Sequence, residues 1–127
     1  MKLARELLAE AQRLHALVSD DERLRTEFPR QSGLIANTFR DYQDEFRKRW
    51  HTTVGRERLL NARYLSIAAD LRILIVVLRG AVRYGNEATI EVKRAEIRDA
   101  VRKLSGLIRD GVAGQQDEQM RTVEALI

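Results

Sequence analysis

The residues of this chain that are best suited to bind another molecule are basic ones gathered in its middle. Residues 47–83 hold nine basic and two acidic side chains, although the net charge of the whole 127-residue chain is only +4. The candidate binding residues for an anionic partner are Arg47, Lys48, Arg49, Arg58, Arg72, Arg79 and Arg83. Guanidinium groups bind carboxylates and phosphates through paired hydrogen bonds, so this set suits a nucleic-acid backbone or an acidic protein surface.

Four of these arginines share one side of a predicted helix. Steps of fourteen, seven and four residues separate Arg58, Arg72, Arg79 and Arg83, which returns each to nearly the same side of an α-helix. The first three have no acidic residue three or four positions away, so any ionic partner must come from another element. One hypothesis is a ladder of interhelical ion pairs, which is the usual fate of arginines beside a bundle core. The candidate internal partners are Asp41, Asp44, Glu45, Glu6 and Glu10. The other hypothesis is an external anionic partner.

The remaining polar residues do not indicate catalysis. The chain has no cysteine and two histidines, His15 and His51, for which we expect structural roles and no metal. Asp70 is the only acid between residues 57 and 87, and we expect it to pair with an arginine such as Arg63. There is no phosphate-binding glycine loop, zinc-hydrolase motif or di-iron motif. We therefore expect a protein that is not an enzyme and has no cofactor.

The elements that position these residues follow from apolar spacing, which is clearest over about residues 56–84. A seam of mostly large residues, at alternating steps of four and three, consists of Leu60, Tyr64, Ile67, Leu71, Leu74, Leu78 and Ala81. A second seam of mostly small residues beside it consists of Ala62, Ser66, Ala69, Ile73, Val76 and Gly80. The two seams predict a helix in the middle of a bundle, packed against two neighbours at different distances. The alternative is a buried strand at residues 73–78, which we reject because the helical period extends through the flanking segments.

The other elements are also predicted to be helices. Apolar spacing predicts helices over residues 2–18, over a short segment that Pro29 ends, over residues 35–50 and over residues 90–110. The third of these has an aromatic-rich stripe formed by Ile35, Phe39, Tyr42, Phe46 and Trp50. Ser19 and Glu22 have the spacing of a capping box, and Thr53 is a candidate N-cap. The segment Gly85-Asn86 predicts a turn, and the glycines at 111 and 114 predict a break before a last short helix with Met120, Val123 and Ile127.

The predicted fold class is therefore all-α. We expect residues 1–127 to form a single antiparallel helical-bundle domain of about four principal helices with one or two short accessory helices. The apolar block at residues 73–78 is far shorter than the roughly 20 residues of a membrane span. The first residues mix acidic and basic side chains, unlike a secretion signal, so we expect a cytoplasmic protein with no membrane association.

Two resemblances bear on function. The segment Ala69-Asp70-Leu71-Arg72, followed by Leu78-Arg79, is similar to a phrase in the PhoU family of helical phosphate-signalling regulators. The acidic metal-binding motif of that family is absent, because Arg83, Gly85 and Asn86 stand where the family would place acids and arginine, so we assign the chain to no family. In size, charge and class the chain also looks like the small helical subunits of CRISPR effector complexes.

The sequence favours a non-enzymatic interaction module, a subunit or adaptor completed by self-association or by a protein partner. The predicted central helix has apolar residues on most of its circumference, and a few long helices leave part of that surface uncovered. The alternative is a protein that binds the nucleic-acid backbone through its basic stretch.

Overall fold

The computed structural model describes the backbone of residues 2–126 and the side chains of residues 2–111. Residues 2–126 form four helices and no strand: α1 (Lys2–Ser19), α2 (Asp21–Thr52), α3 (Gly55–Arg83) and α4 (Glu87–Leu126). The predicted all-α bundle of four principal helices is confirmed. The predicted accessory helices are not separate elements, because they are parts of α2 and α4.

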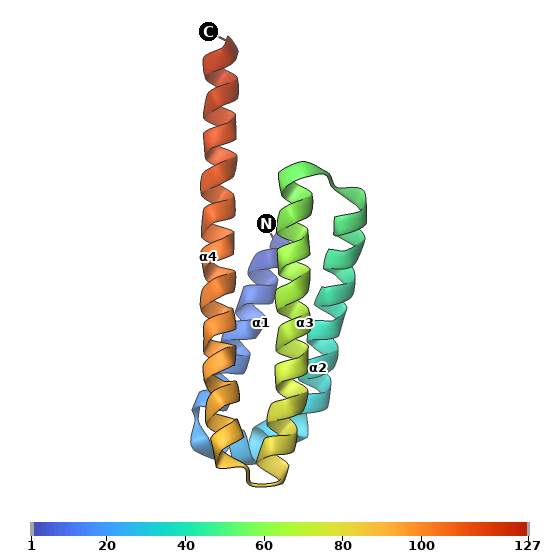
Figure 1. Ribbon diagram of the computed structural model, residues 1–127, viewed down its shortest axis with the longest axis vertical. Coiled ribbons are helices and arrows are strands. Elements are labelled where there is room, and N and C mark those ends of the chain that lie inside the picture. The colour runs from blue at the N-terminus through green and yellow to red at the C-terminus, as the bar shows by residue number, and fades with distance from the viewer. Residues whose placement is uncertain (1, 127) are drawn as a thin grey trace.

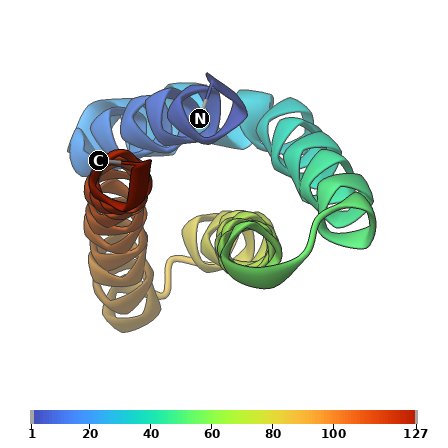
Figure 2. The same cartoon turned by 90° about the horizontal axis from the view of Figure 1, so that it is seen from above.

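Consecutive helices run antiparallel and enclose one core (Figure 1). Each helix packs against its neighbours in the chain, and α1 also packs against α4, so the four helices form a closed ring. Viewed from above, α3 lies between α2 and α4, while α1 and the start of α2 lie across the ring (Figure 2). The ring is filled by aliphatic side chains and by Phe28, Phe39 and Phe46, which are fully buried.

The large-residue seam of α3 faces this core, as predicted. Tyr64, Ile67, Leu71, Leu74, Leu78 and Ala81 are buried, and Leu60 is half-buried. The placement of α3 in the middle of the bundle is wrong, because the small-residue seam faces solvent and not a second neighbour. In a ring of four helices each member buries only the side that faces the others, so α3 leaves its opposite side open.

Helix α2 continues through Pro29, and the predicted end at this residue is wrong. Figure 1 shows that the helix changes direction along its first part, which is the expected effect of a proline inside a helix. Leu24, Phe28 and Ser32 are buried on both sides of the proline, so packing holds the two segments together. The Arg30 guanidinium also donates a 3.0 Å hydrogen bond to the carbonyl of Thr26, near the bend.

The helix boundaries differ in detail from the predicted caps. The N-cap of α2 is Asp20, whose side chain accepts a 3.1 Å hydrogen bond from the Arg23 amide. The N-cap thus lies one residue after Ser19, and the predicted capping box of Ser19 and Glu22 is wrong. Aspartate is as strong an N-cap as serine. Ser19 is instead the last residue of α1. Thr53 is the C-cap of α2 and not the N-cap of α3, a position that Val54 occupies without a side-chain hydrogen bond.

The turns at both ends of α3 follow the sequence prediction more closely. The predicted boundary at residues 52–55 is confirmed, and Gly55 there has a φ of 61°. Gly85 has a φ of 68°, and the Asn86 side chain after it accepts a 3.2 Å hydrogen bond from the Thr89 amide at the start of α4. Glycine adopts positive φ without the steric cost that other residues meet, which explains both positions.

Helix α4 continues past the glycines at 111 and 114, so the predicted break there is wrong. A glycine inside a helix costs only about 1 kcal/mol relative to alanine, and without a proline the helix is not forced to end. The C-terminal part of α4 extends beyond the loop between α2 and α3 (Figure 1). The side chains of Met120, Val123 and Ile127, predicted to belong to a last short helix, lie outside the described residues.

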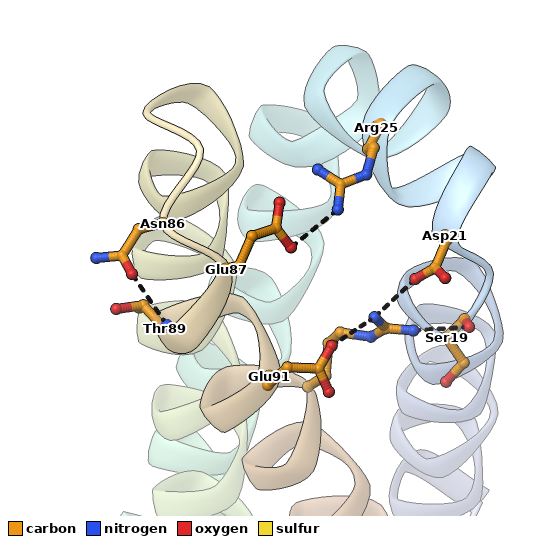
Figure 3. Close-up of polar contacts among 8 residues, drawn as sticks. Ser19, Asp21, Arg25, Asn86, Glu87, Thr89 and Glu91 are labelled. Carbon is orange, nitrogen blue, oxygen red and sulfur yellow. Dashed lines mark hydrogen bonds and ion pairs between the residues drawn. The ribbon is translucent and has the colours of Figure 1, made fainter.

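A cluster of polar contacts joins α4 to the junction of α1 and α2 (Figure 3). The Arg94 guanidinium lies 2.8 Å from the Asp21 carboxylate and 3.1 Å from that of Glu91, and it donates a 2.9 Å hydrogen bond to the Ser19 carbonyl. Arg25 and Glu87 form a second ion pair of 3.0 Å between α2 and α4. These contacts fix the end of the bundle that lies opposite the α2–α3 loop.

Candidate interaction surface on α3

The side of α3 that points away from α1 is not covered by any other helix in residues 2–126 (Figure 2). We call this side the open face. Its residues are all at least partly exposed and comprise Leu59, Ala62, Ser66, Ala69, Ile73, Val76, Val77 and Gly80. Ile73 is 54% exposed and Val76 is 60% exposed, whereas Ile75 between them is fully buried. The open face is thus an apolar strip, with only one hydroxyl, about 30 Å long at 1.5 Å per residue.

The predicted ladder of internal ion pairs is wrong for the arginine row of α3. Among the described side chains, no carboxylate forms an ion pair with Arg58, Arg72, Arg79 or Arg83. Three of the proposed partners bind within their own helices instead: Glu10 pairs with Arg13, Asp44 with Arg47 and Glu45 with Lys48. Neighbours one turn apart meet at lower entropic cost than side chains on separate helices, which explains the preference.

Two arginines of the row contact aromatic rings. The Arg58 guanidinium carbon lies 4.2 Å from the centre of the Trp50 ring, and that of Arg83 lies 5.7 Å from the centre of the Tyr84 ring. Trp50 is half-buried, so the aromatic stripe of α2 leaves the core at its C-terminal end. The Arg58 contact joins the ends of α2 and α3 at their loop.

The other candidate residues divide into two groups. Arg47 and Lys48 each form a 3.1 Å ion pair on the surface of α2. The side chains of Arg49, Arg72 and Arg79 have no ion pair or hydrogen bond with a described side chain. Within residues 2–111 these last three cations therefore have no internal ionic partner, and the seven candidates are spread along α2 and α3 from their loop to the opposite end of the bundle.

Arg40 is a neighbour of the row that the sequence analysis missed. It lines a groove between α2 and α3 together with Arg72, and its side chain is exposed without an ionic partner among residues 2–111. The indication was the loop at residues 53–54, because two antiparallel helices bring residues at similar distances from their connection side by side. Arg40 lies 12 residues before the last residue of α2, whereas Arg72 lies 17 residues after the first residue of α3. The loop therefore predicts that the two helices are adjacent, but not that these two arginines share a groove.

The remaining polar residues have structural or solvated positions. Asp70 is exposed and lacks the predicted arginine partner among residues 2–111. His51 is exposed beside Trp50, with 4.8 Å between the ring centres, and His15 is half-buried on α1. In the part of the chain whose side chains are described, no group of three or more potential ligands is arranged to bind a metal ion.

The loop end of the bundle contains two buried polar groups. Asn61 donates a 3.2 Å hydrogen bond to the Thr53 hydroxyl, which in turn donates a 2.7 Å hydrogen bond to the carbonyl of Arg49. The Tyr64 hydroxyl is buried beside Phe46 and has no hydrogen-bond partner among the described groups. Burial raises the pKa of Tyr64, and burial together with Glu10 and Glu6 raises the pKa of Tyr42.

The raised pKa of Tyr64 predicts a loss of stability at alkaline pH. The folded state holds the phenol proton more tightly than the unfolded chain, whose tyrosine has its ordinary pKa of 10.0. The stabilisation is therefore complete below that value and is lost as pH rises through the folded-state pKa. We expect Tyr64→Phe to make the free energy of unfolding less sensitive to alkaline pH, and to be nearly neutral at pH 7 because no hydrogen bond is removed. Urea unfolding at several pH values measures this. An unchanged alkaline slope would contradict it.

Comparison with known proteins does not identify the chain. No protein-family model, curated protein or solved structure matches it. Within the described residues, no helix combines the length and apolar character needed to cross a membrane. Conclusions about function therefore depend on the surface of this bundle alone.

Proposed function

We propose that this protein is a non-enzymatic interaction module that binds a protein partner through the open face of α3. The observation that supports this is the exposure of Leu59, Ile73 and Val76 in one continuous strip, while most of the other exposed residues among 2–111 are charged. Contiguous exposed apolar strips of this length are typical of binding surfaces, since water contact with them is unfavourable. The small residues Ala69 and Gly80 allow a second backbone to approach closely.

The proposal is tested by placing a photocrosslinking residue at position 76 in the native cell. We expect a covalent adduct of defined mass, whose second component is identified by mass spectrometry and then purified. Val76→Asp should weaken the purified complex by about tenfold or more, because a buried contact becomes a desolvated charge. The control is the same residue at position 5, on the outer side of α1, where we expect no adduct. Equal crosslinking at positions 76 and 5 would exclude the open face as the binding surface.

A second candidate function is binding to the phosphate backbone of a nucleic acid. The specific observation that favours it is the lack of ionic partners for Arg49, Arg72 and Arg79 among the described residues. Its affinity for an unrelated oligonucleotide should fall steeply as salt rises and should weaken in Arg72→Ala and Arg79→Ala. Absence of binding at low salt removes this candidate and leaves the protein interface in place.

A further inference from the structure

Two grooves border the open face, and they differ in charge. The groove between α2 and α3 has a volume of about 430 Å³ and is lined by Ala36, Asn37, Arg40, Arg72, Ile73, Val76 and Val77. The groove between α3 and α4 has a volume of about 370 Å³ and includes the charged residues Asp70, Lys93, Glu96, Asp99 and Lys103. The second groove thus contains charges of both signs, three acidic and two basic, whereas the first has two arginines and no acid.

The two arginines of the α2–α3 groove border an apolar floor. Ile73, Val76 and Val77 form that floor from α3, and Ala36 forms it from α2. Arg72 is half-buried and Arg40 is exposed, and neither forms an ion pair or hydrogen bond with a described side chain. Partial loss of water around a guanidinium strengthens its attraction to a carboxylate, and the planar group binds both carboxylate oxygens at once. This groove therefore favours an occupant that is apolar on one side and negatively charged beside it.

We propose that the occupant of the α2–α3 groove is an amphipathic helix of another protein, with acidic residues flanking its apolar face. This inference rests on the proposed function and specifies its partner. A helix fits because the groove lies between two antiparallel helices, and helix-in-groove binding uses apolar residues at spacings of three and four. No strand edge exists in residues 2–126 to pair with an extended peptide.

Charge argues against a second copy of this chain as the occupant. If two open faces packed together with their α3 helices antiparallel, the arginine row of one copy would lie against the same row of the other. If the helices were parallel, Arg72 and Arg79 would lie beside the positions of Val77 and Tyr84, neither of which is acidic. They would also lie on the side of the α3–α4 groove, whose carboxylates are accompanied by Lys93 and Lys103. An acidic helix satisfies the arginines in either direction.

The experiment is a selection against the immobilised full-length chain with a displayed library of helical peptides about five turns long. Leucine is fixed at the apolar positions, and the flanking positions are drawn from Glu, Lys and Gln. We expect the selected peptides to be enriched in Glu over Lys at the flanks. The affinity of a selected peptide should fall by about tenfold or more in the double variant Arg40→Glu/Arg72→Glu. Exchanging the Glu residues of the peptide for Lys should restore binding to that variant.

Matched controls separate this inference from the proposed function. Arg5→Glu changes the net charge in the same direction as each groove substitution but lies on α1, so it should leave affinity unchanged. One outcome is that the selected peptides need Val76 for binding but are not enriched in Glu, or bind the double variant with unchanged affinity. That outcome would overturn the acidic partner and leave the open face as a binding surface. Peptides whose binding is unaffected by Val76→Asp would overturn both. Dimers of the chain that form with rising concentration and are disrupted by Val76→Asp would identify a second copy as the occupant. Displacement of the peptide by an oligonucleotide would identify a nucleic acid. Either result would overturn the inference.

Discussion

Replacing Ile75 by Asp is expected to unfold this bundle, whereas replacing the adjacent Val76 by Asp is expected to leave it folded. Ile75 is fully buried in the core, and Val76 is 60% exposed on the open face. Burial of an isoleucine side chain contributes about 1.5–3 kcal/mol, and a carboxylate in its place adds a desolvation penalty of several kcal/mol. Together these costs approach the roughly 5–15 kcal/mol by which a typical small domain is stable.

Circular dichroism during urea unfolding measures both variants. We expect Ile75→Asp to lose the cooperative transition, and Val76→Asp to change the free energy of unfolding by no more than about 0.5 kcal/mol. Ile75→Val serves as the conservative control, with a cost of about 0.5–1.5 kcal/mol. An equal loss of the free energy of unfolding in the two Asp variants would mean that Val76 is buried in the folded protein. The open face would then not exist in solution.

The second large effect is expected for Phe39→Ala at the centre of α2. Phe39 is fully buried among the aliphatic residues of the core, and its removal leaves a cavity that a rigid helix pair cannot close. Phe→Ala changes at such positions cost about 3–5 kcal/mol, which is a large part of the stability of a bundle of this size. The shift of the urea midpoint at constant slope measures the cost.

Two controls make this prediction specific to the core position. Phe39→Leu keeps most of the apolar volume and should cost much less than the alanine variant. Leu34→Ala removes a large apolar side chain that is 73% exposed on the same helix, and it should change the free energy of unfolding only slightly. A loss below about 1 kcal/mol for Phe39→Ala would contradict the packing of α2 against α3 described here.

Local chemistry explains which predictions from sequence were confirmed. The buried side of α3, from Tyr64 to Ala81, could be predicted from the spacing of its large apolar residues. Residues three and four positions apart lie on the same side of any α-helix, whatever surrounds it. The turn at Gly85 and Asn86 was predictable for the same reason, since the glycine conformation and the cap both lie within a few residues. The all-α class follows from this periodicity.

The errors at Pro29 and at the glycines of α4 have one physical cause. A helix breaker imposes a local cost of about 1 kcal/mol for glycine and about 3 kcal/mol for proline. Burial of Phe28 before Pro29 and of Phe39 after it contributes a comparable or larger stabilisation, but it depends on helices that are distant in sequence. Local propensity alone therefore could not decide whether the chain bends or ends.

Three features of this protein follow from its sequence alone. The chain forms long amphipathic helices, the large-residue seam of α3 faces the core, and basic residues follow one side of that helix. Only the tertiary structure decided that the small seam faces solvent, that Glu10, Asp44 and Glu45 pair within their own helices, and that Arg40 joins Arg72 in one groove. The reason is that helical periodicity records which residues share a side, whereas the arrangement of the four helices in space decides what each side meets.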